Sequence, residues 1–322
     1  MEHSTADSRA TARSWTPQRT ACRFLLLLTM LVGATGCSQQ ETTELLPPPQ
    51  KKIYNPPYPN DPVTPFQIIG NIYYVGMANY SAYLISTPEG LILLDTMLES
   101  TLPVLQENIR KLGFKVEDIK ILLQAHAHVD HVGGLVDMKQ LTGAKVYVMA
   151  EDADVLADGG VSDFRGDGRQ LWKPVQADVI LQDGDQITLG GTTMAAHLTA
   201  GHTKGCTTWS TQTEEGGQIY NVVFVCSNRV NDNIPMIDNP KYPNMPEDFA
   251  SGFAKLKSLP CDVFLASHAF MFNMQEKRTR QEQGAEPNPF IDPEGYRTYI
   301  ADFEYDFRYR LQQERLEKQS QY

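Results

Sequence analysis

The chain has 322 residues, of which 39 are acidic and 28 basic, so its formal net charge is -11 at pH 7. An acidic chain of this length argues against nucleic acid as a partner. It is also too long for a small fold that disulfides alone hold together.

Residues 1–37 have the composition of a secretory signal. Arginines precede the short apolar run 24–32, and small residues then lead to Cys37. The run is too short for a normal membrane span. Gly36-Cys37 resembles the lipobox of bacterial lipoproteins, in which the cysteine is lipidated and becomes N-terminal. We therefore expect a periplasmic protein, with Cys37 as a lipidation site that anchors it to the outer membrane. The alternative is simple cleavage and release.

Two further regions follow the signal. Residues 38–65 are proline-rich and polar, which predicts an extended tether without a core of its own. Residues 66–322 are long enough for one domain with a substantial core.

The periodicity of apolar residues predicts two sets of elements in this domain. In the first set we expect strands at 67–75, 81–86, 91–94, 119–123 and 145–149, and helices at 98–112 and 130–141. A second set begins near residue 178, with strands at 179–181, 186–189, 192–199, 207–211, 219–225 and 262–266, and helices at 246–257 and from 293 onward. Asp183-Gly184-Asp185 and Glu215-Gly216-Gly217 are typical of hairpin turns. Strands that first meet in series and then alternate with helices predict an α/β (α+β) fold, a four-layer αββα sandwich of two mixed sheets with outer helices.

A cluster of metal-binding side chains follows the expected strand 119–123. Within six positions the chain carries His126, His128, Asp130 and His131. His126 and His128 should point the same way, because side chains alternate near a strand end. Asp130 and His131 should lie on the turn into the next helix. One short segment could therefore supply ligands to two adjacent metal ions.

Two further histidines, His202 and His268, follow apolar runs and stand beside small or turn-forming residues. Taken alone, each would more often be an ordinary core or surface imidazole. His197 lies inside an expected strand, and we interpret it as an ordinary strand residue.

Three cysteines lie in the expected domain. Cys206 follows the loop that carries His202, and Cys226 ends a strand expected near that loop. An oxidising periplasm permits a disulfide, so we favour a pairing of Cys206 with Cys226 and a buried, free Cys261. The alternative is three inert buried thiols.

The His126-x-His128-x-Asp130-His131 motif resembles that of the metallo-β-lactamase superfamily, and the match spans about residues 66–311. Thioesterases, lactonases, nucleases and oxidoreductases of the same fold share the motif. The segments 201–209 and 288–297 look like the third subclass of class B, or zinc-dependent, β-lactamases. Ser227 is aligned where the first two subclasses have a cysteine ligand and many other hydrolases have a bridging aspartate. A shift of one residue would instead make Cys226 a ligand.

The resemblance implies two Zn²⁺ ions. The first would be bound by His126, His128 and His202, and the second by Asp130, His131 and His268. A metal-bound hydroxide, oriented by Asp130, would attack the β-lactam carbonyl of penicillins, cephalosporins and carbapenems. The expected protein is thus a monomeric class B β-lactamase that confers resistance.

Ser227 and Arg229 are the candidates for substrate binding. Arg229 could form a charge-assisted bond with the substrate's carboxylate, and the alternative is a solvated surface charge. Phe164 and Trp172 lie in the irregular segment 158–174, where they could wall the groove or serve local packing.

Two other functions remain as alternatives. One is a hydrolase of the same fold that acts on another ester, a lactone or a thioester; Ser227 in place of a bridging aspartate argues against it. The other is a zinc-binding lipoprotein without turnover. A ligand set that leaves coordination positions open argues against this, because a structural zinc site closes its coordination with protein groups.

Overall fold

The computed structural model describes residues 45–49 and 60–320. The predicted signal, Cys37 and most of the predicted tether lie outside the described residues. Within the described part of the chain, none of the helices combines the length and the apolar character needed to cross a membrane.

The first sheet is mixed and has seven strands, in the same order in space as along the chain. They are β1 (Phe66–Ile69), β2 (Ile72–Tyr74), β3 (Tyr83–Thr87), β4 (Gly90–Leu94), β5 (Ile119–Leu123), β6 (Lys145–Met149) and β7 (Val179–Leu181). Strands β1 to β4 pair antiparallel, and β4 to β7 pair parallel. The carboxyl ends of β4, β5 and β6 therefore meet at one edge of the sheet.

The second sheet has five strands in the order β12-β11-β10-β9-β8. They are β8 (Gln186–Leu189), β9 (Thr192–Leu198), β10 (Thr207–Glu215), β11 (Gln218–Val225) and β12 (Val263–Ala266). The neighbours pair antiparallel except β11 and β12, which are parallel. This sheet is mixed as well.

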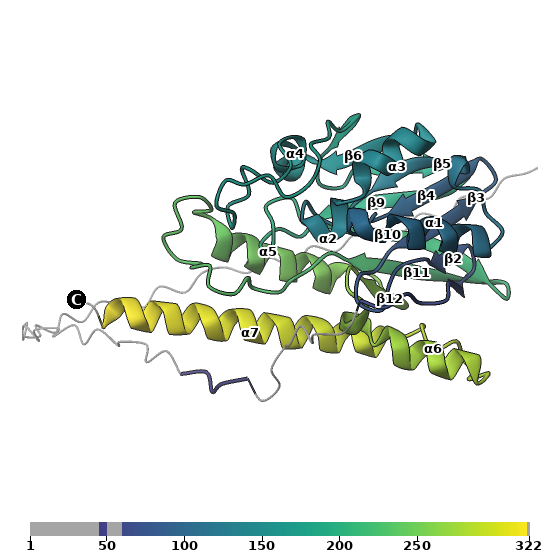
Figure 1. Cartoon of the computed structure of the whole chain (residues 1–322). Coiled ribbons are helices and arrows are strands. Elements are labelled where there is room, and N and C mark those ends of the chain that lie inside the picture. The colour runs from purple at the N-terminus through teal and green to yellow at the C-terminus, as the bar shows by residue number, and fades with distance from the viewer. Residues whose placement is uncertain (1–44, 50–59, 321–322) are drawn as a thin grey trace, which may run out of the picture. The chain divides into compact units, whose positions relative to one another are not determined.

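Helices cover the outer faces of the two sheets. They are α1 (Leu102–Lys111), α2 (Val129–Val132), α3 (Leu135–Thr142), α4 (Ala150–Ala157), α5 (Met245–Ser258), α6 (Met274–Glu282) and α7 (Pro293–Gln319). Figure 1 shows α5 and the long helix α7 on the side of the strands opposite to α3 and α4.

The alternation of side chains along each strand sorts the core into two parts. In β4, Ile92 and Leu94 join the large cluster that contains residues of both sheets and of α5 and α7. Leu91 and Leu93 join a second cluster with Leu105 of α1. This is the period of two that a doubly covered strand requires. The expected αββα sandwich is confirmed.

Most expected strands are present, with three corrections. The single strand expected at 67–75 is two strands, β1 and β2, which pair antiparallel on either side of a turn at Gly70. Strand β7 pairs with β6 and so belongs to the first sheet, although the sequence placed it in the second set. The turn Asp183-Gly184-Asp185 therefore joins the two sheets and is not a hairpin. The other expected hairpin is present, because Gly216 and Gly217 connect β10 to β11 with positive φ angles of 61° and 80°.

Two helices were not predicted. Helix α4 begins at Ala150, immediately after β6 ends at Met149, so no loop residues mark its start. Helix α6 has the sequence Met-Gln-Glu-Lys-Arg-Thr-Arg-Gln-Glu, which carries no apolar periodicity. The predicted helix 130–141 is present as α2 and α3, interrupted at Gly133-Gly134.

Candidate metal centre

The candidate ligands lie in loops at one edge of the sandwich. The motif from His126 to His131 follows β5, His202 lies between β9 and β10, and His268 follows β12. A bond from the amide of Thr207 to the carbonyl of Ala125 (2.8 Å) ties the start of β10 to the motif. Both sheets therefore contribute to the same site.

Three imidazoles form the first group of side chains. The ring centroids of His126 and His128 are 4.4 Å apart, and each ring lies 4.8 Å from that of His202. All three side chains are buried. One nitrogen from each lies within 4.8 Å of the others, which is close enough for a shared metal ion.

The second group consists of Asp130, His131 and His268. Oδ2 of Asp130 lies 3.5 Å from Nε2 of His131 and 3.6 Å from Nε2 of His268. The rings of His126 and His131 are 4.1 Å apart, so the two groups are neighbours. The structure thus brings together all six predicted ligands in the two expected sets of three.

Hydrogen bonds to the other ring nitrogen orient two of the histidines. Nδ1 of His131 donates to Oδ2 of Asp95 (2.9 Å), and Nδ1 of His202 donates to the backbone carbonyl of Arg229 (2.8 Å). Each bond leaves Nε2 free to face the centre. A carboxylate or carbonyl behind a ligand histidine fixes its tautomer and raises its basicity.

Asp95 is a functional residue that the sequence analysis missed. It is buried, and its second oxygen accepts a bond from the amide of Ala125 (2.7 Å), at the start of the ligand motif. Its position directly after β4 could have indicated this role. Strands β4 and β5 are parallel neighbours, so the residues that follow them lie close together. Asp152, at the start of α4, was missed as well.

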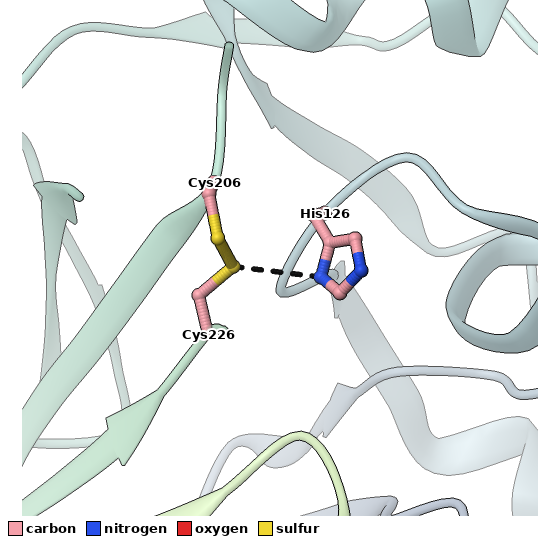
Figure 2. A group of neighbouring side chains, drawn as sticks. All are labelled: His126, Cys206 and Cys226. Carbon is pink, nitrogen blue, oxygen red and sulfur yellow. Dashed lines mark hydrogen bonds between the residues drawn. A yellow bond between two sulfur atoms is a disulfide. The ribbon is translucent and has the colours of Figure 1, made fainter. Parts of the chain in front are cut away.

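A disulfide lies beside the ring of His126, as Figure 2 shows. It joins Cys206 to Cys226, and Nδ1 of His126 lies 3.4 Å from Sγ of Cys226. Both sulfurs lie within 4.8 Å of a nitrogen of this imidazole. Because they are joined in a disulfide, however, neither can bind a metal as a thiolate. The alternative alignment that makes Cys226 a ligand is therefore not the arrangement found. Cys261 is free, but it is only partly buried rather than buried.

The predicted substrate-binding residues have other partners here. Ser227 is 1% exposed, and its hydroxyl accepts a bond from the amide of Arg229 (3.4 Å). The guanidinium of Arg229 is partly exposed and pairs with Asp232, which also binds Arg310 at 3.2 Å. It is the carbonyl of Arg229 that contacts a candidate ligand.

The aromatic residues of the segment 158–174 are buried and serve local packing. Phe164 is buried against Tyr242, with ring centroids 5.0 Å apart, and Trp172 is buried beneath Gly160. The segment instead reaches the centre with Asp163, whose Oδ2 lies 3.7 Å from Nε2 of His128.

Burial is the largest influence on the pKa values of the imidazoles. Burial and repulsion by neighbouring imidazoles hold the pKa of His126 well below the usual range, and burial and the charge of Arg165 do so for His128. Burial also lowers the pKa of His202 to about 3 and that of His268 to about 4. These rings are therefore neutral at pH 7, which is the form that binds metal.

The pKa values of His131 and Asp130 are set by their mutual attraction. Burial lowers the pKa of His131, but Asp130 and Asp95 outweigh it, so the pKa is raised. Burial raises the pKa of Asp130, but His131 and His268 outweigh it, so the pKa is lowered. Asp130 is thus a carboxylate in the neutral range, as a metal ligand must be.

The donor set fits zinc. Among the described residues, the buried Nε2 atoms of His126 and His131 have no hydrogen-bond partner, although the other nitrogen of each ring has a contact. An unpartnered buried nitrogen is costly, and a metal ion would satisfy it. Imidazole and carboxylate groups in sets of three are the ligands of a catalytic Zn²⁺.

Comparisons with known proteins agree with this fold and site. The family model of the metallo-beta-lactamase superfamily matches residues 75–268, and the chain belongs to this superfamily. Within it, the chain is similar to subclass B3 enzymes of known structure.

Three solved structures illustrate the similarity. Native FEZ-1 metallo-beta-lactamase from Legionella gormanii is 43% identical, with a TM-score of 0.78 over 80% of this chain and 99% of that one. BJP-1, a subclass B3 enzyme of Bradyrhizobium japonicum, is 39% identical, with a TM-score of 0.75 over 80% and 97%. LRA-12, a class B3 di-zinc enzyme from an Alaskan soil metagenome, is 34% identical, with a TM-score of 0.75 over 78% and 95%. This similarity supports β-lactamase activity.

Proposed function

We propose that this chain is a zinc-dependent β-lactamase that hydrolyses the cyclic amide of penicillins, cephalosporins and carbapenems, and so confers resistance to them. The observation that carries the proposal is the pair of adjacent buried ligand groups at one edge of this fold. The named β-lactamases that match the chain over nearly their full length support it.

The chain would hold two Zn²⁺ ions, one with His126, His128 and His202 and the other with Asp130, His131 and His268. When bound, Zn²⁺ supplies a Lewis acid and brings the pKa of water near neutrality. Asp130 stays a carboxylate because His131 and His268 lower its pKa, so it can accept a hydrogen bond from the attacking water and orient it. The imidazoles of His126, His128, His202 and His268 stay neutral because burial lowers their pKa values. Hydrogen bonds from Nδ1 to Asp95 and to the carbonyl of Arg229 direct the Nε2 atoms of His131 and His202 toward the centre.

Arg229 is our candidate for the substrate's carboxylate, with Ser227 beside it. Its guanidinium is partly exposed and already binds the carboxylate of Asp232, so a substrate carboxylate would replace or join an existing partner. A charge-assisted bond of this kind contributes about 1.5–3 kcal/mol.

The Arg229→Ala variant should therefore raise KM roughly 10-fold or more, with a small effect on kcat, because the bond is made in the ground state as well as the transition state. Steady-state kinetics with metal content measured in parallel would check this. Arg310→Ala is the matched control, since Arg310 shares Asp232 but lies on α7. Unchanged kinetic constants in Arg229→Ala would remove the proposed role.

We further propose export to the periplasm and lipidation at Cys37, on the sequence of the first 37 residues alone. Replacing Cys37 with serine and following membrane fractionation would test the anchor. A chain that stays soluble with Cys37 intact would rule it out.

The direct test of the function is carbapenem hydrolysis by the purified domain, followed by loss of β-lactam absorbance. Turnover should be abolished by a chelator and restored by Zn²⁺. A folded protein that binds two zinc ions without turnover would reject this substrate class and lead to lactone and thioester panels.

A further inference from the structure

A buried carboxylate connects the two loops that carry the three-histidine group. Asp152 stands in the first turn of α4, directly after β6, and is 2% exposed. Its Oδ2 accepts bonds from the amide of Ala127 (2.9 Å) and the hydroxyl of Thr203 (2.9 Å). Its Oδ1 accepts from the amide of Gly205 (2.7 Å).

These three donors flank the three histidines. Ala127 lies between His126 and His128 in the loop after β5, whereas Thr203 and Gly205 follow His202 in the loop between β9 and β10. One side chain therefore fixes the backbone on both sides of the group. In contrast, its hydrogen bonds reach neither Asp130, His131 nor His268.

The loop with His202 is pressed against this carboxylate. A Cβ at Gly205 would lie 2.5 Å from the amide nitrogen of Asp152 and 2.6 Å from its Cγ. Glycine is therefore required at 205 for the backbone to approach so closely. The contact is tight enough to transmit a displacement of Asp152 to the ligand loop.

Burying the charged carboxylate of Asp152 is unfavourable, and a neutral side chain at this position would avoid that penalty. Burial raises the pKa of this carboxyl, and its hydrogen bonds come from neutral amides and a hydroxyl rather than from a cation. Only a carboxylate, however, accepts bonds on both oxygens at once. An asparagine would present an NH₂ group to one of the donors and release one loop.

We propose that Asp152 is a positioning residue that holds the three-histidine group in its ligand geometry and so sets the affinity of that group for metal. It leaves the group of Asp130, His131 and His268 unaffected. The inference rests on the proposed function only in that both groups bind zinc; it does not require a β-lactam substrate.

The test is metal binding by Asp152→Asn, measured by competition with a chromophoric zinc chelator, in two backgrounds. The His268→Ala background weakens the group of Asp130, His131 and His268 and leaves the three-histidine group intact. In this background Asp152→Asn should lower zinc affinity roughly 10-fold or more. His202→Ala weakens the three-histidine group, and here Asp152→Asn should change the affinity of the remaining site less than 2-fold.

Asn71→Ala is the matched structural control. Asn71 also makes several bonds to neighbouring strands, but it lies in the turn between β1 and β2 and bonds the carbonyl of Ser86, at the end of β3 away from the centre. It should lower stability without changing either affinity. An equal loss of affinity in both backgrounds, or no loss in either, would overturn the proposal.

A milder variant covers the case in which Asp152→Asn does not fold. Thr203→Val removes one of the three donors and keeps the carboxylate, so it should cause a smaller loss, about 3-fold, that is still confined to the His268→Ala background. Loss in both backgrounds would overturn the proposal here too. Because no readout is turnover, a failure is distinct from a failure of the β-lactamase assignment.

Discussion

The ligand side chains depend on residues that never face the metal centre. Asp95 accepts the Nδ1 proton of His131 and also an amide proton of the ligand loop, so one carboxylate orients a ring and a backbone segment. The backbone carbonyl of Arg229 orients the ring of His202 by accepting its Nδ1 proton. The geometry of the centre therefore depends on the groups that hydrogen-bond to its candidate ligands.

Replacing Asp95 with asparagine should lower the affinity for zinc of the group formed by Asp130, His131 and His268. The amide cannot match the carboxylate as an acceptor for His131, and changes of this kind cost roughly 10- to 100-fold in metal affinity. Zinc titration against a competing chelator would measure it. Asp137→Asn is the control, because this partly exposed aspartate on α3 pairs with Lys173 rather than with a candidate ligand. Equal affinities in the two variants would contradict the prediction.

The lowered pKa of His202 predicts that acid destabilises the metal-free protein. In the unfolded chain this histidine titrates near 6.5, whereas in the folded chain its pKa is about 3. Between these values the unfolded state binds more protons, so stability falls as pH falls, by up to about 1.4 kcal/mol per pH unit for one group.

Urea unfolding of the metal-free protein at pH 7, 6 and 5 would show this slope. His202→Gln cannot take up the proton and should have a shallower slope than the unchanged chain. The prediction is wrong if the two slopes coincide.

The sequence predicted the candidate ligands that the structure brings together, but it did not predict the residues behind them, and the reason is physical. His126, His128, Asp130 and His131 stand within six positions, so their crowding is visible without a fold. Asp95 and Asp152 are single acidic residues at the ends of separate elements, and their roles arise only when parallel strands bring those ends together. The hydrogen bond from His202 to Arg229 is made to a backbone carbonyl, which any residue type could supply, so the sequence gives no sign of it.

At the level of elements, strands were more predictable than helices. The expected bounds of β5 and β6 agree with the structure, because alternating or continuous apolar runs mark them. Helix α6 is almost wholly polar, so it lacks the stripe that identifies a helix. Strand β7 was assigned to the wrong set because pairing with β6 is a long-range choice that three residues cannot specify.

The disulfide between the elements β10 and β11 gives a prediction about stability. Cys206 precedes β10 and Cys226 follows β11, with a sequence separation of 20. Closing a loop of this length contributes about 3 kcal/mol to the free energy of unfolding. The Cys206→Ser, Cys226→Ser double variant should lose about that amount in denaturant unfolding.

Cys261→Ser is the control for that measurement, because Cys261 is free. A double variant as stable as the control would show that the bond does not contribute. The double variant should also retain both zinc ions, since neither sulfur belongs to the two ligand groups.

For the whole molecule, metal binding should be a major part of stability. Neither ligand group is complete within one sheet: His202 and His268 come from the second half of the chain, and the other ligands come from the first. Each ion at 100 times its Kd would add about 2.7 kcal/mol to the free energy of unfolding.

Removing the metal with a chelator should therefore lower Tm by several degrees, and adding Zn²⁺ should restore it. Thermal unfolding at fixed pH would check this. A variant without both His202 and His268 is the control, and it should show little response to either treatment. A chelator-insensitive Tm in the unchanged chain would contradict the prediction.

Because the candidate ligands are divided between the two halves of the chain, zinc binding should require that both halves are correctly assembled. Within the described residues the chain passes between the sheets through the turn 182–185. If the chain were cut there, the apolar faces would draw the two fragments together, but a complete ligand set would form only when both were in register. Zinc uptake by such a split pair would then report reconstitution of the native sandwich, distinct from mere hydrophobic association.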